Sequence, residues 1–266
     1  MPNVVLPEVN CLLIEGPDAW RFAQAQFSGD VEPLAEGRWQ WNAWLDAQGR
    51  VQALMHLADL GGERLLAVLR GGDAGTICAG LARYVFRAKA TVTARIFSGH
   101  AERALPMGCI DADARKGITI GYGDRSLRLK APGTHADPQA ANAWRLAEIR
   151  AGWPVLPAGD VQFLPAALAL ERLGAVSLDK GCYPGQEIVA RLHYRGGHKF
   201  SLYHVRGPVA LEPGATKLAE GIGPVHVLDC AMATGTTEAL VVAQKININT
   251  FNIMNNKYDV ISRYNT

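Results

Sequence analysis

The segment from residue 39 to residue 57 limits the fold of this chain more than any other feature. Apolar and polar side chains alternate through 39–45 and again through 51–57, and Asp46-Ala47-Gln48-Gly49 separates the two runs. A period of two places successive side chains on opposite faces of a strand, and a short turn that contains Gly joins antiparallel neighbours. The segment therefore predicts a β-hairpin, so a sheet must be part of the fold.

Helical and strand patterns flank this hairpin. Gly16-Pro17-Asp18 predicts a helix start, because Pro is tolerated in a first turn and Asp complements the N-terminal dipole. Strands are predicted at 64–69 and 91–97. The helix predicted between them has apolar positions at helical spacing, namely Ile77, Leu81, Val85 and Ala88. An order of hairpin, strand, helix and strand is typical of an α+β layer with its helix on one sheet face.

The rest of the chain predicts a second unit and a barrel. Two short strands within 118–130 precede a helix at 139–151, which follows Asp137-Pro138 and ends at Gly152. From His198 onward, short alternating runs are separated by turns that contain Gly and Pro, a pattern typical of a small β-barrel. We therefore predict an α+β fold of two similar units, each a sheet with helices on one face, followed by a barrel: residues 1–100, 101–197 and 198–244.

Residues 245–266 differ in composition from everything before them. They contain neither Gly nor Ala, and they hold six of the ten Asn residues of the chain. Our hypothesis is that this tail derives from a foreign reading frame or an added extension. The alternative is a native terminal strand, in which 258–264 pairs with the barrel edge. Intact mass compared with the chromosomal coding sequence separates the two explanations.

Composition argues against several functional classes. The 27 basic and 25 acidic residues give a net charge of +2, too small to indicate nucleic-acid binding. No apolar run approaches the roughly 20 residues that cross a bilayer. The five cysteines are scattered and form no Cys-x-x-Cys pair, which favours reduced thiols over disulfides or a zinc site. We expect a soluble, cytoplasmic monomer that binds neither nucleic acid nor membranes.

Cys182 has the most reactive setting of the five cysteines. Gly181 and Gly185 allow close approach of backbone and ligand, and cationic side chains lie on both sides of the cysteine in the sequence. Neighbouring cations favour the thiolate, the nucleophilic and metal-binding form. The alternative, a small apolar side chain under a tight turn, is equally compatible with the local pattern. The other four cysteines lie in apolar segments and are predicted to be buried: Cys11, Cys78, Cys109 and Cys230.

The segment around Cys182 resembles a known family. Lys180-Gly181-Cys182-Tyr183-Pro184-Gly185-Gln186-Glu187 is similar to the hallmark Lys-Gly-Cys-Tyr-x-Gly-Gln-Glu of the YgfZ family, relatives of the glycine-cleavage T-protein. The likeness covers nearly everything up to about Gln244. It includes Ala151-Gly152-Trp153-Pro154, Gln162-Phe163-Leu164-Pro165, Ile188-Val189-Ala190-Arg191 and, weakly, Gln26-Phe27-Ser28-Gly29-Asp30-Val31.

The resemblance implies a cloverleaf of two folate-binding-type domains and a β-barrel around an opening that takes tetrahydrofolate. It also implies a role in assembly or repair of iron-sulfur proteins, with those proteins or their assembly machinery as partners and oxidative stress as the revealing condition. The motif cysteine of the family maps onto Cys182, with Lys180 beside it as a second catalytic candidate. A folate-associated tryptophan maps onto Trp144, and a second one falls near Val9, where this chain lacks an aromatic side chain.

Folate chemistry matches residue types near these positions. A flat pterin needs an aromatic or apolar slot, its donor edge suits a carboxylate or amide, and its glutamate tail suits Arg or Lys. The predicted folate-binding residues are Trp144, Tyr183, Gln186, Glu187 and Arg191. Each has a structural alternative: Trp144 as helix core, Glu187 and Arg191 as an ion pair, and the arginines as a solvated face.

Two other functions remain open from the sequence. An aminomethyltransferase would transfer a one-carbon unit to tetrahydrofolate, but Gln52 and Ala53 stand where the T-protein has carboxylates after its first hairpin turn. An amide or a methyl group cannot supply the charge that positions the reacting amine. Arg150 also replaces an acidic residue, and Glu148, two positions earlier, faces another direction on a helix. The third reading is a non-catalytic scaffold regulated by folate.

Overall fold

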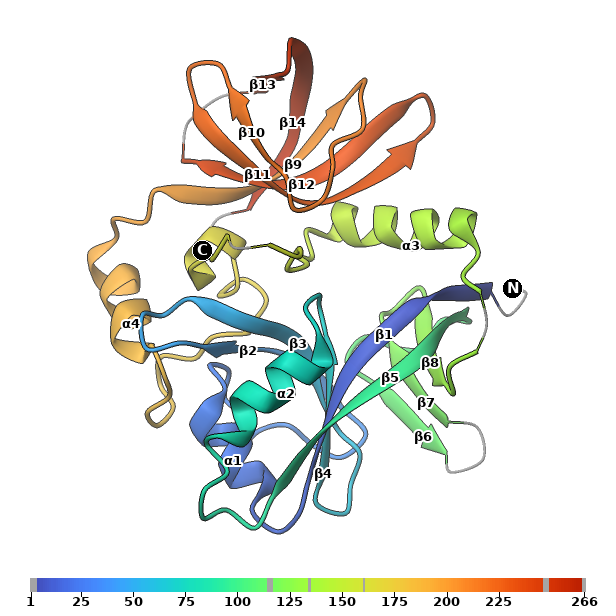
Figure 1. Cartoon of the computed structure of the whole chain (residues 1–266), viewed down its shortest axis with the longest axis vertical. Helices are drawn as coiled ribbons and strands as arrows, with labels where there is room; N and C mark the ends of the chain where they lie inside the picture. The colour runs from blue at the N-terminus through green and yellow to red at the C-terminus, as the bar shows by residue number, and fades with distance from the viewer. Residues whose placement is uncertain (1–3, 114–116, 134, 160, 246–248, 265–266) are drawn as a thin grey trace.

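The computed structural model describes residues 4–113, 117–133, 135–159, 161–245 and 249–264. These residues form one eight-stranded sheet and one closed six-stranded barrel. The barrel lies at the top of Figure 1, the sheet lies at the bottom, and helix α3 runs between them. The predicted α+β fold with a terminal barrel is confirmed.

The elements follow the chain in three groups. The first group is β1 (Val4–Glu15), α1 (Ala19–Gln26), β2 (Trp39–Leu45), β3 (Val51–Asp59), β4 (Arg64–Leu69), α2 (Ala74–Ala82) and β5 (Thr91–Glu102). The second is β6 (Ile110–Asp113), β7 (Gly117–Gly121), β8 (Ser126–Lys130), α3 (Pro138–Ala151), a 3-10 helix η1 (Pro165–Leu168) and α4 (Gln186–Arg195). The barrel contains β9 (Phe200–Gly207), β10 (Thr216–Ala219), β11 (Gly223–Ala233), β12 (Thr236–Gln244), β13 (Thr250–Ile253) and β14 (Asn256–Tyr264).

The strands of the two predicted units share one sheet. Its order is β2-β3-β4-β1-β5-β8-β7-β6, with β2 and β3 paired as the predicted hairpin. The long strands β1 and β5 pair from Val4↔Ala101 to Glu15↔Thr91 with one irregularity at Leu6/Glu8, and β5 pairs with β8 on its other side. Because β5 spans position 100, the division into domains at 1–100 and 101–197 stays a prediction.

Helices α1 and α2 cover one face of the sheet and enclose an apolar core that includes Phe22, Phe27, Ile77 and Leu81. The Asp73 side chain caps α2 by accepting from the Thr76 backbone N–H at 2.7 Å. The helix ends at Ala82, earlier than the sequence spacing predicts, because tight turns follow it: Tyr84 and Val85 donate to carbonyls three residues before them. Val85 and Ala88 pack against the core from outside the helix.

The other sheet face packs against α3 and the barrel. Its core joins Trp39, Trp41 and Tyr122 of the sheet region with Trp153 after α3 and Leu240 of the barrel. Helix α3 has the ends that the sequence predicts: Asp137 accepts from the backbone N–H groups of Gln139 and Ala140, and Gly152 closes the helix with φ 66°. No described helix has the length and apolar character needed to span a membrane.

The barrel closes through strands of the Asn-rich tail. β14 pairs with β9, and β13 pairs with β10. The described part of 245–266 therefore supplies two of the six barrel strands. Tyr264 then reaches α3, where its ring lies over Gly152 and its hydroxyl donates to the Arg150 carbonyl at 3.3 Å. Residues 246–248 and 265–266 lie outside the described residues. The foreign origin of the tail stays a hypothesis about the gene.

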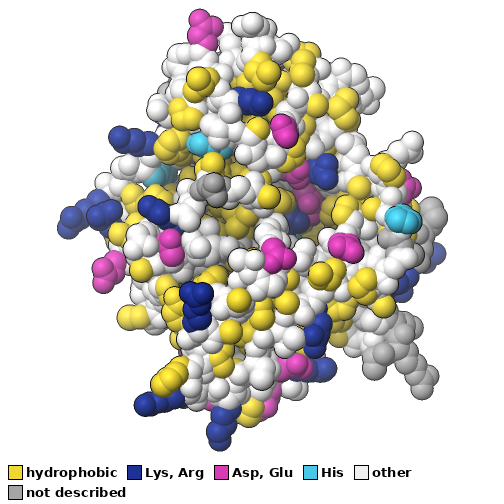
Figure 2. Space-filling view, in the orientation of Figure 1, with side chains coloured by type: hydrophobic (Ala, Val, Ile, Leu, Met, Phe, Trp, Pro, Cys, Tyr) yellow, Lys and Arg dark blue, Asp and Glu magenta, His cyan; other side chains and the backbone are white. Residues whose placement is uncertain are grey.

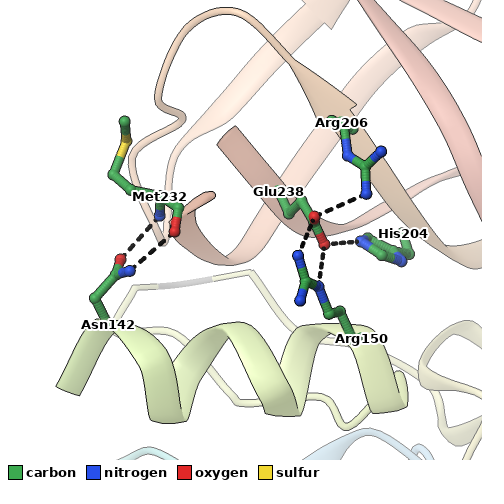
Figure 3. Close-up of polar contacts among 6 residues, drawn as sticks. All are labelled: Asn142, Arg150, His204, Arg206, Met232 and Glu238. Atoms are coloured by element: carbon green, nitrogen blue, oxygen red, sulfur yellow. Dashed lines mark hydrogen bonds and ion pairs between the residues drawn. The ribbon is translucent and has the colours of Figure 1, made fainter. Parts of the chain in front are cut away.

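Polar contacts hold the barrel on α3 (Figure 3). Arg150 donates to both carboxylate oxygens of Glu238 at 3.0 and 2.8 Å, and His204 and Arg206 complete the set at 2.9 Å each. These hydrogen bonds hold the pKa of Glu238 down at about 2, although its burial opposes the shift. About two helical turns before Arg150 on α3, Asn142 forms two hydrogen bonds with the backbone of Met232.

Candidate functional site

Lys180 ties the motif loop to α1. Its ammonium group donates to the backbone carbonyls of Gln24 and Phe27 at 2.6 Å each and to that of Gly29 at 3.0 Å. These carbonyls lie at the C-terminal end of α1, where the helix dipole favours a cation. Burial lowers the pKa of Lys180 to about 8. All three donors of this ammonium are engaged, so the contacts are those of an anchor.

Tyr183 and Gly185 provide two further anchors. The buried Tyr183 ring lies 5.4 Å from the Lys180 ammonium, and its hydroxyl donates to the Ser177 carbonyl at 3.1 Å. Gly185, with φ 78°, packs on the turn of the β2–β3 hairpin so tightly that a Cβ would lie 2.5 Å from the Asp46 carbonyl oxygen and 2.6 Å from the Gly49 Cα. The motif therefore bridges α1 and the first hairpin.

Cys182 is exposed on this bridge, between the anchors at positions 180 and 183. Cys11 and Cys230 are buried, as predicted, and burial raises the pKa of both thiols. The prediction was wrong for Cys78 and Cys109, which are only partly buried: Cys78 donates to the Val92 carbonyl, and Cys109 accepts from Arg38 Nη1 at 2.7 Å. Cys182 is thus the most accessible thiol of the five.

Three of the predicted folate-binding residues lie on α4, directly after the motif. Gln186 and Glu187 form its first turn, where the negative charge of Glu187 complements the helix dipole. Glu187 and Arg191 are both exposed, and the described residues contain no ion pair between them. Helix α4 lies at the left edge of the molecule in Figure 1, whereas Trp144 lies in the middle of α3.

Trp144 lines a different hollow, which we call the α3 pocket. It has a volume of about 280 Å³ and lies between Trp144, Arg145 and Glu148 of α3, the start of β1, the end of β4 and Asp229 of β11. Val9 lines it as well. Trp144 and Val9, the positions at which the resemblance predicts folate-associated side chains, therefore line one cavity. Tyr183, Gln186, Glu187 and Arg191 do not line it.

A buried ion pair forms the polar wall of the α3 pocket. Arg70 Nη1 donates to Glu148 Oε1 at 2.7 Å, and the indole N–H of Trp144 donates to the same oxygen at 3.0 Å. The side chains of Arg70 and Glu148 are only 10% and 7% exposed. Burial disfavours the charged guanidinium, but Glu148 more than compensates, so the pKa of Arg70 is raised.

The Arg70 guanidinium has nitrogen donors that make no hydrogen bond with the described residues. Its Nε and Nη2 atoms are buried and have no hydrogen-bond partner among the described residues. Buried donors are paired in the great majority of native structures, so an unpaired guanidinium edge beside a cavity is a sign of a missing acceptor. The α3 pocket can therefore supply donors at Arg70 and an acceptor at Glu148 to the same flat molecule.

Asp229 and Arg145 form the outer wall of the α3 pocket. Arg145 Nε lies 3.2 Å from Asp229 Oδ1. Burial nevertheless raises the pKa of Asp229 to about 6, against the opposing effect of Arg145. This carboxyl group can therefore change its protonation near neutral pH.

The ion pair was missed from the sequence, although one signal was present. Trp144 and Glu148 are separated by four positions, which places them on one helix face. The sequence argument did place Glu148 and Arg150 in different directions, and this is correct: Glu148 contacts Arg70, whereas Arg150 contacts Glu238. The partner, Arg70, carries no local signal, because it only follows a strand and precedes Gly71-Gly72.

The described residues contain no group of three or more His, Cys, Asp or Glu side chains placed to hold a metal ion.

Comparisons with known proteins agree with the resemblance of the motif. No family model matches the chain. The tRNA-modifying protein YgfZ of Pectobacterium carotovorum is 28% identical over 75% of this chain and 68% of its own length. The protein of the same name from Photorhabdus laumondii is 26% identical over 91% and 80%. An uncharacterized Haemophilus influenzae protein is 26% identical over 75% and 71%.

A solved structure matches the fold along nearly the whole chain. Glycine cleavage system aminomethyltransferase T from Bartonella henselae superposes with a TM-score of 0.70, at 15% identity, over 96% of this chain and 83% of that one. The sequence relatives and the shared fold both agree with the resemblance seen in the sequence. The chain is a homologue of the YgfZ proteins, built on the fold of aminomethyltransferase T.

Proposed function

We propose that this protein binds tetrahydrofolate, or another folate, with the pterin in the α3 pocket. The observation that carries the proposal is the buried Arg70 guanidinium: Arg70 lines the α3 pocket, and two of its nitrogen atoms have no partner among the described residues. A pterin presents a carbonyl acceptor next to amino and ring N–H donors. Arg70 would donate to the acceptor, and Glu148 would accept from the donors.

Trp144 and the dimensions of the pocket fit the same ligand. An indole beside the cavity offers an apolar, polarisable surface to a flat ring. The volume of about 280 Å³ lies near the lower limit for small-molecule sites, which suits the bicyclic head of a folate better than the whole molecule. The remainder would extend toward Arg145, whose charge suits the glutamate tail.

Cys182 would act separately from the folate. We propose that its exposed thiol supports the assembly or repair of iron-sulfur proteins, with Lys180 and Tyr183 positioning the loop that presents it. An exposed thiol on a loop with fixed ends can reach a partner protein without a conformational change. The name of the relatives, tRNA-modifying protein, indicates tRNA modification as one cellular process in which this support would be visible.

Aminomethyl transfer receives no support from the hairpin. Gln52 donates to Asp46 at 3.3 Å, and Ala53 lies in the core beneath α1 and α2. Neither side chain offers a carboxylate to a reacting amine.

Titration calorimetry with tetrahydrofolate tests the folate proposal. We expect saturable binding that weakens at least tenfold, about 1.4 kcal/mol, in Trp144→Phe and in Glu148→Gln. Cys182→Ala is the matched control and should bind as tightly as the native chain. Equal affinity in all four proteins would place the folate elsewhere.

The thiol proposal is tested in cells that lack their own relative. Activity of an oxygen-sensitive iron-sulfur enzyme is measured under hydroperoxide stress after expression of the native chain, Cys182→Ala or Cys78→Ala. We expect rescue by the native chain and by Cys78→Ala only. Full rescue by Cys182→Ala would instead favour a scaffold. A monomeric state and a cytoplasmic location remain predictions.

A further inference from the structure

An apolar groove lies between α4 and the barrel, and it shares no lining residue with the α3 pocket. We call it the α4 groove. It has a volume of about 310 Å³, and its walls are Leu192 of α4, the 161–167 segment, the 197–200 segment and strands β11 and β12. Its floor contains Phe163 and Phe200, whose rings lie 5.8 and 6.2 Å from the His226 ring. The groove offers a slot for a large apolar side chain.

Positive charge predominates around the α4 groove. None of the residues that line it is acidic, and Lys199 stands exposed at its rim. Arg191 and Arg195 are exposed on the outer side of α4. Figure 2 shows Lys, Arg and His side chains, together with acidic ones, among apolar side chains along the left side of the molecule, where α4 and the start of β9 lie in Figure 1. Two acidic side chains lie nearby: Glu171 contacts His193 at 3.0 Å, and Glu187 is exposed in the first turn of α4.

Two more features distinguish this surface from a solvated helix face. Tyr194 is 74% exposed on α4, next to His193, and tyrosine and arginine are the side chains most enriched at interface hot spots. Val161, at the edge of the groove, is 39% exposed. Helix α4 is also short: its ten residues span roughly 15 Å, and Cys182 lies just before its first turn.

From these observations we infer that the α4 groove and the outer face of α4 bind an acidic segment of a partner protein, with a large apolar side chain of that segment inserted in the groove. Complementary charge around a desolvated anchor is the usual basis of such recognition. An apolar slot of this kind is not what a phosphate backbone requires, so a protein segment fits better than RNA. The inference rests on the proposed function only in taking this partner to be the protein that Cys182 serves.

The probe is a short fluorescein-labelled peptide in which Leu and Phe alternate with Glu, measured by fluorescence anisotropy with the whole chain. We expect saturable binding that weakens at least tenfold in Arg195→Glu/Lys199→Glu and in Val161→Glu. Arg87→Glu/Arg95→Glu changes two exposed charges elsewhere and should bind like the native chain. The same peptide with Lys in place of Glu should not bind.

The other outcomes contradict the inference. Absence of saturable binding, or equal binding by all variants, would overturn it. Binding of an RNA hairpin that is lost in Arg195→Glu/Lys199→Glu, without binding of the acidic peptide, would make this a nucleic-acid surface instead. Calorimetry with tetrahydrofolate on the same variants keeps the two proposals apart, because folate affinity should be unchanged in each of them.

Discussion

Glu148 on α3 and Glu238 of the barrel, which contacts α3, are both buried carboxylates, but their hydrogen bonding differs. Glu238, at the barrel interface, receives four hydrogen bonds from Arg150, His204 and Arg206, spread over both of its oxygens (Figure 3). Glu148, at the sheet interface, receives both of its bonds on one oxygen, and its partner Arg70 keeps two buried nitrogens without partners. The side chains of Glu238 and Glu148 are 0% and 7% exposed.

The difference separates a structural contact from a binding site. A buried charge whose hydrogen bonds are all made contributes to the placement of the elements that it joins. A buried guanidinium with unused donors costs stability until a ligand supplies acceptors. We therefore propose that the Glu238 cluster docks the barrel and that the Arg70–Glu148 pair takes part in ligand binding.

The largest expected effect is on stability, in Glu238→Gln. The substitution leaves Arg150 and Arg206 without a counter-charge, so we expect a loss of about 3 kcal/mol in the free energy of unfolding. Urea denaturation followed by tryptophan fluorescence measures it. Glu102→Gln, which breaks a partly exposed pair with Arg128, is the control and should cost less than about 1 kcal/mol. A Glu238 variant as stable as the control would contradict a structural role for the Glu238 cluster.

Replacing the Arg70–Glu148 pair by apolar residues should lower folate affinity without lowering stability. In Arg70→Met/Glu148→Leu no buried charge remains unpaired, so stability should be unchanged or raised. Affinity for tetrahydrofolate should fall by about a hundredfold, or roughly 2.7 kcal/mol. Denaturation and calorimetry on one preparation give both values. A large loss of stability with intact folate binding would show that the roles of the two clusters are reversed.

Lys180→Met should have a smaller effect. Three carbonyls at the end of α1 lose their donor, but part of the ammonium desolvation is recovered, so we expect a loss of about 1 to 2 kcal/mol. Folate affinity should stay native, whereas rescue of iron-sulfur enzymes should decline because the Cys182 loop is less well fixed. Lys180→Arg, which keeps the charge in a different shape, should recover part of the stability.

The last prediction concerns the pH dependence of stability. The folded pKa of Asp229 is raised from 3.8 to about 6 by burial. The folded protein therefore binds this proton more tightly than the unfolded chain, and Asp229 lowers stability as pH rises from about 4 to 6. Glu238 acts in the opposite sense: its pKa of about 2, against 4.5, adds stability above pH 4.5 that is lost as pH falls toward 2.

Asp229→Asn should accordingly remove the decline in stability between pH 4 and 6. The loss of stability at lower pH, which is due to Glu238, should remain. Denaturation midpoints measured over that range in the native chain and the variant decide this. Parallel curves would mean that the carboxyl group titrates at its ordinary pKa.

The sequence predicted elements better than it predicted the site. Periodicity and turn residues gave the hairpin around Gly49 and the ends of α3, because those depend on neighbouring positions. It did not predict that β1 and β5 would join the two units in one sheet, since pairing of strands far apart in the chain leaves no local pattern. Strand β1 itself was not predicted.

For the site as well, the sequence indicated some residues, whereas others depend on contacts between distant parts of the chain. The sequence singled out Cys182 as the reactive candidate but left a small apolar side chain under a tight turn as an equal alternative. The anchoring of Lys180 on α1 depends on carbonyls more than 150 positions away. Trp144 was singled out through the family, whereas Arg70 was not, because its importance arises only from burial next to Glu148. Helix α4 also places Gln186, Glu187 and Arg191 outside the α3 pocket, which nothing in their spacing could reveal.

The central claim is that the unpartnered edge of Arg70 is the binding site for a pterin, and a crystal structure of the protein with tetrahydrofolate bound tests it most directly. We predict the pterin beside Trp144, with its carbonyl oxygen accepting from Arg70 Nε or Nη2 and its amino edge donating to Glu148. A folate bound elsewhere, with the Arg70 nitrogens still unpaired, would contradict the account.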